Sequence, residues 1–257
     1  RSGHSGEVRR HLSRGLSLVT GRAWGAQQEY EESLTARTDD AFMDPVSPLT
    51  VRLSQLFPVS APVDRAAPQI VLSTRFEVAQ LRARIVLHEP PRNFFVLGNK
   101  LREIADIGGL STDLIETPMV HQLDISDIED GNYQVRVEVY SGDRNLGSSG
   151  TPLFVRRGLS ERVAALRAVA REANDDVKAD ILYPLDMMRK ISHDILAADG
   201  FDVDAELSAA EAIAQEKNPF KDKRGDFERH YFLEGSGEIM PYRIFVPASY
   251  TKSKRHP

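Results

Sequence analysis

Two kinds of hydrophobic spacing alternate along the chain. In one, apolar residues recur every three or four positions, which indicates the apolar stripe of an amphipathic helix. The first such stripe consists of Val8, Leu12, Leu16 and Val19. In the other, apolar and polar residues alternate one by one, which indicates a strand with one buried face. The order of these patterns predicts a helical start, a strand-rich middle, a second helical region and a final hairpin.

Residues 1–57 are predicted to form a helical N-terminal segment. After the first stripe, Tyr30 and Leu34 continue the helical spacing in a second helix over residues 26–43. A serine–proline start followed by spaced leucines predicts a short third helix, marked by Ser47, Pro48, Leu49, Leu53 and Leu56. The three stripes are narrow, so we expect these helices to dock onto another part of the protein.

The middle of the chain, residues 69–158, is predicted to be an immunoglobulin-like β-sandwich. A proline-rich stretch, residues 58–68, precedes it and predicts an extended linker. Alternating runs bounded by turn residues predict three strands of the sandwich, at residues 80–87, 133–140 and 153–157. The pattern over residues 94–116 predicts no definite element.

Residues 159–218 return to helical spacing and are predicted to be a helical connector. Pro184 is expected to interrupt the pattern and to start a new helix. Gly200 is a predicted helix stop, because glycine adopts the left-handed conformation found just after helices. Either Asp202 or Asp204 is predicted to cap the last helix.

Composition narrows the function classes. The chain has 257 residues, a formal charge of −5 and a calculated pI near 5.9, which disfavours non-specific binding to nucleic acid. It contains no cysteine, so disulfides, thiolate nucleophiles and cysteine–metal sites are excluded. No apolar run is long enough to predict a membrane span.

No catalytic, cofactor-binding or metal-binding residue is predicted within the chain. Gly3–Glu7 reads GHSGE, which lacks the last glycine of a Gly-x-Ser-x-Gly elbow and has no strand before it. His88 and Glu89 precede two prolines, which excludes a helical zinc motif. Four acidic residues, Asp124, Asp127, Glu129 and Asp130, predict a solvated turn, with a weak calcium site as the alternative.

The remaining polar motifs are predicted to be structural. The acidic run at residues 199–206 fails the EF-hand template and indicates a helix stop followed by a helix cap. His193 and His230 are predicted to be packing or surface residues rather than catalysts. Gly235–Gly237 lacks the third glycine of a dinucleotide loop. The basic tail Lys252–His256 predicts an exposed connection.

The C-terminal residues carry the most specific pattern. Two alternating runs, His230–Leu233 and Tyr242–Val246, flank a Gly-Ser-Gly turn and predict an antiparallel hairpin. The segment 237–247, GEIMPYRIFVP, also resembles the opening hairpin of the catalytic domain in one branch of the α/β-hydrolase family. This branch contains polyester depolymerase-like, feruloyl-esterase-like and prolyl-oligopeptidase-type serine hydrolases. The resemblance implies that residues 219–257 are the first hairpin of a hydrolase domain.

The same resemblance implies where the chemistry lies. In that family the next residues form a buried strand and an oxyanion-hole loop beginning His-Gly, and the nucleophile, acid and histidine have no matching positions in this chain. The implied partner is therefore the chain's own C-terminal hydrolase domain. A secreted or periplasmic location is implied by the family alone.

These patterns together predict an α+β fold: an immunoglobulin-like sandwich flanked by helices, ending in a hairpin. The leading hypothesis is a non-catalytic N-terminal accessory region of a serine hydrolase; the alternative is a stand-alone β-sandwich binding or structural module. Assembly into a homo-oligomer is a further partner hypothesis. We expect residues 228–257 to be poorly packed or docked on the sandwich, and we expect the chain alone not to hydrolyse a nitrophenyl ester.

Overall fold

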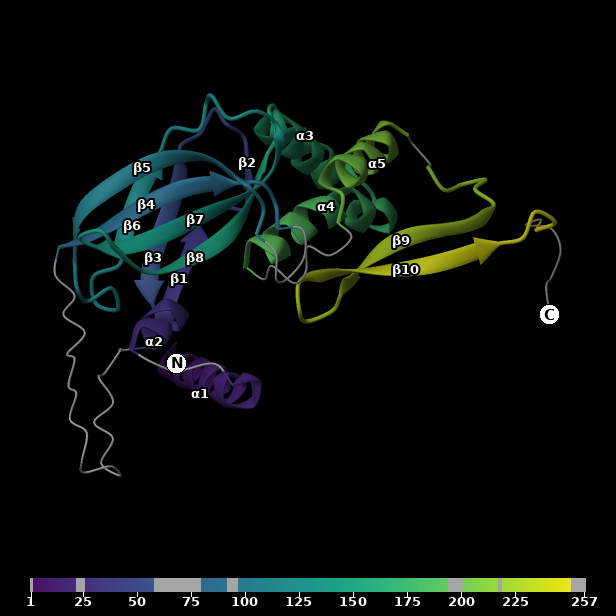
Figure 1. Cartoon of the computed structure of the whole chain (residues 1–257). Coiled ribbons are helices and arrows are strands. Elements are labelled where there is room, and N and C mark those ends of the chain that lie inside the picture. Colours follow the sequence, from purple (N-terminus) through teal and green to yellow (C-terminus); the bar gives the residue numbers. More distant parts are fainter. Residues whose placement is uncertain are drawn as a thin grey trace. The chain divides into compact units, whose positions relative to one another are not determined.

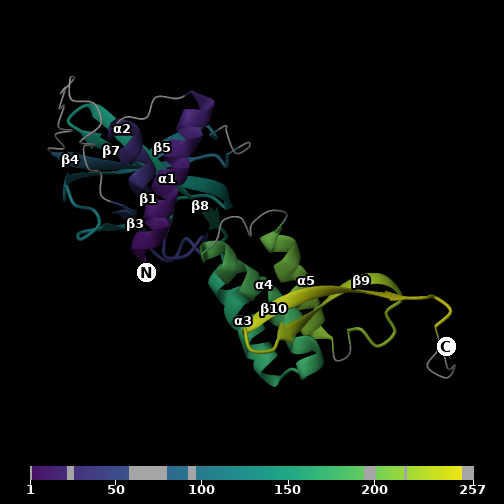
Figure 2. The same cartoon turned by 90° about the horizontal axis from the view of Figure 1, so that it is seen from below.

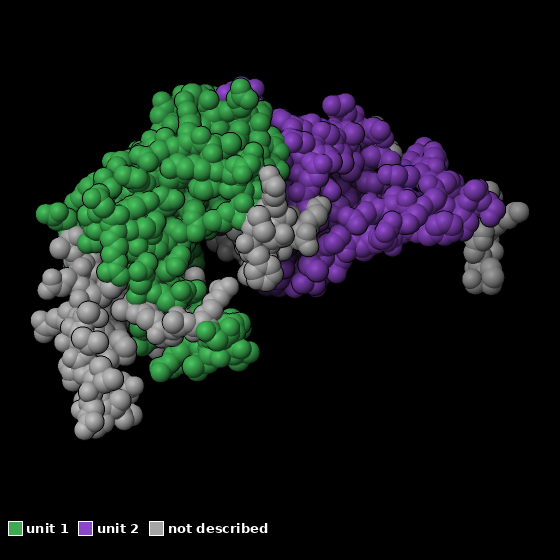
Figure 3. Space-filling view, viewed as in Figure 1, with its two compact units in different colours: residues 1–156 green, residues 157–257 purple. Residues whose placement is uncertain are grey.

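The protein is described by a computed structural model that covers residues 2–21, 26–57, 80–91, 97–193, 201–216 and 219–250. Within these ranges the chain forms five helices and ten strands, which is an α+β fold with several sheets (Figure 1). The chain divides into two compact units, residues 1–156 and 157–257 (Figure 3).

Unit 1 holds the strand-rich part of the chain. Its elements are α1 (Ser2–Thr20), α2 (Ala26–Ser33), β1 (Leu34–Thr38), β2 (Phe42–Met43), β3 (Leu49–Gln55), β4 (Leu81–His88), β5 (Lys100–Leu110), β6 (Met119–Leu123), β7 (Gly131–Ser141) and β8 (Arg144–Val155). One sheet has the order β1-β3-β6 and the other β2-β8-β7-β4-β5. Neighbouring strands are antiparallel, except that β2 runs parallel to β8.

The two sheets of unit 1 share one hydrophobic core. Alternate residues of β7, from Val135 to Val139, are fully buried, and so are alternate residues of β3 in the other sheet, from Leu49 to Leu53. Both sets belong to a single cluster of packed apolar side chains. A core between two sheet faces defines a β-sandwich, so the predicted α+β class and the predicted strands in β4, β7 and β8 are confirmed.

Two predicted helices of the N-terminal segment are wrong. The helix predicted over residues 26–43 ends at Ser33, where β1 begins, and the helix predicted from Ser47 to Leu56 is strand β3. Leucines four positions apart lie on one face of a helix, which has 3.6 residues per turn. They also lie on one face of a strand, because successive strand side chains alternate between the two faces. Pairing of β3 with β1 and β6 buries this stretch and selects the strand.

Helix α1 forms as predicted, but it does not dock by its apolar stripe. Polar contacts attach it to α2: Arg10 pairs with Glu29 at 2.5 Å, and the Ser13 hydroxyl donates to Glu32 at 3.1 Å. The predicted stripe faces solvent instead, with exposed fractions from 57% to 86% for Val8, Leu12, Leu16 and Val19. The expectation that this stripe would be buried is wrong.

Several predictions lie outside the described residues. They concern the linker at 58–68, the first part of the predicted sandwich at 69–79, and the helix stop at Gly200. The sequence predicted no definite element over residues 94–116. This stretch contains β5, an edge strand of the five-stranded sheet. The division of the chain into five segments stays a prediction.

Unit 2 consists of three helices and a hairpin: α3 (Leu159–Glu172), α4 (Asp175–His193), α5 (Val203–Gln215), β9 (Gly225–Leu233) and β10 (Glu238–Val246). Its buried side chains come from all three helices, among them Leu166, Ile181 and Leu207. The predicted interruption at Pro184 is wrong, because α4 continues through this residue. The predicted cap is confirmed, since Asp202 precedes α5 and accepts from its first amides.

The predicted hairpin is confirmed, and so is its expected poor packing, because Ile239 is the one buried residue in the stretch 225–246. β9 and β10 pair antiparallel over nine residues each, and the pair lies across α4 (Figure 2). The amide of His230 on β9 donates to Asp180, and the amide of Ile239 on β10 donates to Asp186. Side chains of α4 therefore satisfy outward backbone groups on both strands. Residues 251–257 of the segment lie outside the described ranges.

Candidate functional site

The outer face of the five-stranded sheet carries a cluster of charged side chains around one tyrosine. Arg82 and Arg84 alternate with the buried residues of β4 and stand opposite β7. Their guanidinium carbons lie 5.6 and 4.9 Å from the ring centroid of Tyr140, within cation–π range. Burial and a hydrogen bond to Glu138 raise the pKa of Tyr140, which keeps its hydroxyl protonated.

These two arginines are weakly paired. Asp106 on β5 lies 3.5 Å from the Nε of each, beyond ordinary charge-assisted hydrogen-bond length. Both Nε atoms are buried without a hydrogen-bond partner in the described part of the chain. By contrast, Arg102 in the same unit binds Asp127 through two hydrogen bonds of 2.6 and 2.7 Å.

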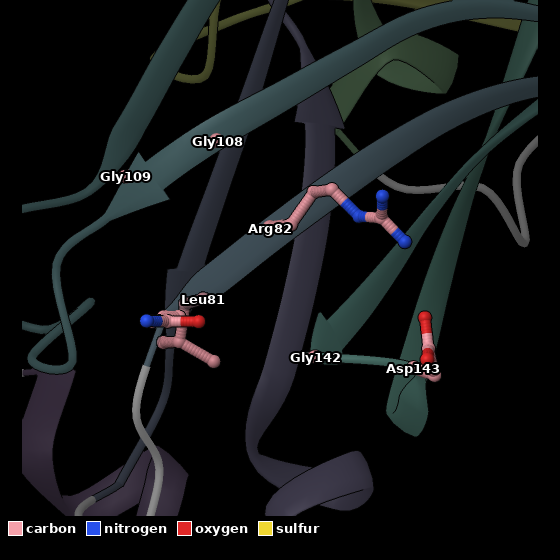
Figure 4. Close-up of a pocket in the computed structure, with 7 residues that line it drawn as sticks. Leu81, Arg82, Gly108, Gly109, Gly142 and Asp143 are labelled. Atoms are coloured by element: carbon pink, nitrogen blue, oxygen red, sulfur yellow. The ribbon is translucent and has the colours of Figure 1, made fainter.

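A hollow of about 370 Å³ opens at the end of this sheet (Figure 4). It is lined by Gln80, Leu81, Arg82, Gly108, Gly109, Gly142 and Asp143. Gln80, Gly109 and Gly142 have φ of 55°, 71° and 59°, so left-handed turns shape the rim. A methyl group added to any of its three glycines would meet no atom within 4 Å, so the rim is open. In Figure 4 the Arg82 side chain extends toward the strands whose turn carries Asp143.

The cluster and the hollow offer charged side chains of both signs beside an open rim, an arrangement that can hold polar groups of a ligand. In the described ranges, no group of three or more histidine, aspartate or glutamate side chains is arranged to hold a metal ion. No described helix is long and apolar enough to cross a membrane.

The predicted acidic turn at Asp124–Asp130 is structural. The Asp124 carboxylate accepts a hydrogen bond from the amide of Ser126 at 2.9 Å, and the Asp127 carboxylate accepts one from Arg102. These hydrogen bonds lower the pKa of both carboxyl groups. Asp124 also borders a second hollow of about 300 Å³, between the turn at Pro45–Pro48 and the end of β6.

Unit 2 contains a buried junction that the sequence did not reveal. Asp180 on α4 is 2% exposed, and three groups of β9 converge on it. Arg229 Nε donates to Oδ2 at 3.0 Å, while the amide of His230 and its ring Nδ1 lie 2.8 and 3.1 Å from Oδ1. The His230 ring stacks on Tyr183 of α4, with ring centroids 3.7 Å apart. We call this group the Asp180–His230 junction.

Two glutamate side chains add negative charge around the junction. Glu228 Oε1 lies 3.5 Å from His230 Nε2. Burial raises the pKa of Glu206 on α5; the charge of His230 opposes this shift and that of Glu228 adds to it. An Asp–His pair resembles the base of a catalytic triad. Here Nε2 is buried and has no hydrogen-bond partner among the described residues, so the pair has no accessible nucleophile to activate.

The other predicted motifs have structural roles. Gly3–Glu7 lies within α1, not at a strand-to-helix elbow. Gly235–Gly237 belongs to the hairpin turn, and both glycines have positive φ. His88 is buried, with Nδ1 3.1 Å from the carbonyl oxygen of Gly98. The side chain of His193 and the tail Lys252–His256 lie outside the described residues.

Comparisons with known proteins leave the family open. No protein-family model matches the chain, and no curated protein matches it. Among solved structures, the chain is similar to the CARDB domain of a Pyrococcus furiosus protein crystallised in complex with di-metal ions. The TM-score is 0.27, the identity is 9%, and the match covers 48% of this chain and 87% of that one. So low a TM-score carries no argument, and this match gives no support to the resemblance to serine hydrolases.

Proposed function

We propose that unit 1 is a non-catalytic binding module built on an immunoglobulin-like sandwich. The strand order supports the finer fold assignment: β1, β3 and β6 correspond to strands A, B and E, and β8, β7, β4 and β5 to strands G, F, C and C′. Strand β2 adds a short parallel edge to β8. Sandwiches of this type carry many unrelated functions, so the function depends on the surface features of this chain.

The observation that carries the proposal is the pair of under-satisfied arginines beside Tyr140. A guanidinium whose ion pairs exceed hydrogen-bond length can still engage a partner's carboxylate or carbonyl oxygens. Tyrosine and arginine are also enriched among residues that dominate binding interfaces. The mixed charges and the open hollow fit a polar, solvated partner surface, such as an extended peptide or a folded protein.

An array of peptides and oligosaccharides, probed with the whole chain, tests this proposal. We expect peptide binding that Arg84→Glu weakens by about tenfold, since truncating or reversing an interface charge costs on that order. Arg52→Glu is the matched control, because Arg52 is an exposed arginine of the other sheet that is paired with Asp39. Equal loss in both variants, or binding to neither array, would refute the proposed surface.

A second candidate function is the accessory region of a serine hydrolase, and one face of the hairpin favours it. Seven of the ten positions on this face of β9 and β10 are apolar or aromatic: Phe227, Tyr231, Leu233, Met240, Tyr242, Ile244 and Val246. Tyr231, Leu233 and Tyr242 are 38–45% exposed. A two-stranded sheet with an apolar open face is suited to being covered by further structure. A secreted or periplasmic location is proposed only as part of this second candidate function.

Reading the native coding frame beyond Pro257 tests the second candidate. It expects an apolar strand, a loop beginning His-Gly and, later, a Gly-x-Ser-x-Gly elbow. A stop codon there would exclude it. An assay of the purified chain with a nitrophenyl ester separates both candidates from an enzyme: each expects no turnover, and turnover blocked by a serine-reactive phosphonate would contradict both.

A further inference from the structure

We propose that helix α1 attaches unit 1 to the surface of an anionic lipid bilayer, with the apolar side of the helix buried at the membrane interface. The proposal is independent of the function proposed for the outer face of the five-stranded sheet. It rests on an inverted arrangement: α1 (Figure 1) contacts the rest of unit 1 through its polar side and exposes its apolar side.

The first step concerns the polar side of α1. Successive residues of a helix are about 100° apart, so Arg10, Ser13 and Ser17 share one side. Arg10 pairs with Glu29, whose side chain is 2% exposed, and the Ser13 hydroxyl donates to Glu32. Ser17 is itself buried. Contacts with α2 therefore occupy the side of the helix that would normally face water.

The second step concerns the opposite side. It carries five exposed aliphatic side chains: Val8, Leu12, Leu16, Leu18 and Val19. At about 100° per residue they span about 160° of the helix surface, and we call this surface the α1 apolar arc. Gly15 lies within the arc, and a methyl group built on it would meet no atom within 4 Å. An apolar face this wide is normally buried, and an exposed one marks an interaction surface.

The third step concerns charge. The charged residues of α1 are three arginines and one glutamate, although the whole chain has a formal charge of −5. Arg14 is exposed and has no ion-pair partner among the described residues. It lies at the edge of the arc, one turn before Leu18. From there its aliphatic stem can follow the apolar surface while the guanidinium reaches a lipid phosphate.

These features fit a bilayer better than a second copy of the chain. Five aliphatic side chains offer on the order of 400 Å² of apolar surface, so two arcs together would bury less than about 1,000 Å², whereas stable specific interfaces bury about 1,200–2,000 Å². A second copy would also bring the same excess of arginines to the contact. A bilayer with anionic headgroups has no fixed shape to match, and it attracts basic amphipathic helices that lie in its interface.

Co-sedimentation of the whole chain with lipid vesicles tests the proposal. We expect binding to vesicles of equal parts phosphatidylglycerol and phosphatidylcholine, and about fivefold weaker binding to phosphatidylcholine alone, the factor expected of one unpaired arginine at an anionic surface. Arg14→Glu should remove this preference. The double variant Leu12→Ser with Leu16→Ser should weaken binding to both kinds of vesicle by about tenfold or more, because it removes apolar surface from the arc.

The matched control is the double variant Leu97→Ser with Leu101→Ser, which changes two leucines of unit 1 that are 49% and 47% exposed and lie outside α1. It should bind vesicles like the wild type. All four leucines are exposed, so neither double variant threatens the fold. Absence of binding to anionic vesicles, or equal binding by the two double variants, would refute the proposal.

Sedimentation equilibrium without lipid tests the rival occupant. We expect the wild-type chain and the Leu12→Ser, Leu16→Ser variant to show the same molecular mass. A wild-type dimer that this variant converts to a monomer would mean that a second copy covers the α1 apolar arc, and the lipid proposal would then be wrong.

Discussion

At the scale of single residues, the close approach of α2 to β8 depends on a glycine. Gly147 is buried, and a methyl group built on it would lie 2.7 Å from both Cα and Cβ of Glu31. We expect Gly147→Ala to destabilise unit 1 by about 1–3 kcal/mol, because neither backbone can move without disturbing its sheet or helix. Urea denaturation measures the loss. Gly108→Ala is the control: its methyl group would enter open space and change stability by less than about 0.5 kcal/mol.

A second residue-scale prediction concerns pH. Arg162 on α3 binds Glu211 on α5 through contacts of 2.6 and 3.0 Å, and this hydrogen bonding lowers the pKa of Glu211. A carboxyl group whose folded pKa is lowered contributes stability above its unfolded pKa, near about 4.3, and loses it as pH falls through the folded value.

Because both side chains are about one-third exposed, we expect Glu211→Gln to cost only about 0.5–1 kcal/mol at neutral pH. The cost should shrink in acid, as the pH falls through the lowered pKa of Glu211 and the wild-type carboxyl group takes up its proton as well. Denaturation midpoints at neutral and at acidic pH measure this difference. Glu216→Gln, at the exposed end of α5, is the control. An equal loss at both pH values would assign the effect to packing rather than charge.

At the scale of elements, the start of α5 depends on one side chain. Asp202 Oδ1 accepts the amides of Asp204 and Ala205 at 3.1 and 3.2 Å, which satisfies donors that have no partner within the helix. We expect Asp202→Ala to destabilise unit 2 by about 1 kcal/mol, and Asp202→Asn, which keeps the acceptor, by a few tenths. Thermal unfolding followed by circular dichroism compares the two, and equal losses would argue against the cap.

The sequence predicted correctly those elements whose hydrophobic spacing fits either the helix period or the strand period, but not both. The strict alternation of β7 and the Gly-Ser-Gly turn of the hairpin admit only strands, and both were found. Strand β3 was missed because Leu49 and Leu53 fit either period, and its burial depends on β6, some 70 residues away along the chain. The apolar stripe of α1 was wrongly predicted to be the docking face. The helix is attached through the ion pair between Arg10 and Glu29, and the spacing of residues in the sequence does not indicate such a pair.

The junction in unit 2 was equally inaccessible to sequence reasoning. Asp180 and His230 are 50 residues apart, and neither belongs to a recognisable motif. Histidine in a half-buried strand predicts a packing residue, which describes the stacking on Tyr183 but not the pairing with Asp180. The partners of a buried charge are selected by packing of helix against hairpin, and this packing has no fixed spacing in the sequence.

At the scale of the whole molecule, each compact unit has its own buried core. The main apolar cluster draws every one of its members from unit 1, while the buried residues of α3, α4 and α5 pack within unit 2. Two such cores predict that damage to one unit leaves the other folded. Ile85 in β4 and Leu207 in α5 offer a matched pair of tests, because both are 0% exposed.

Truncating either side chain to alanine should cost about 2–5 kcal/mol within its own unit, through lost burial and the cavity left behind. Amide exchange on the whole chain locates the damage. Ile85→Ala should accelerate exchange in β4, β7 and β8 and leave α3–α5 protected, and Leu207→Ala should do the reverse. Faster amide exchange in both units of either variant would mean that the chain unfolds as one cooperative body. A cavity in one unit would then lower the free energy of unfolding of the whole chain.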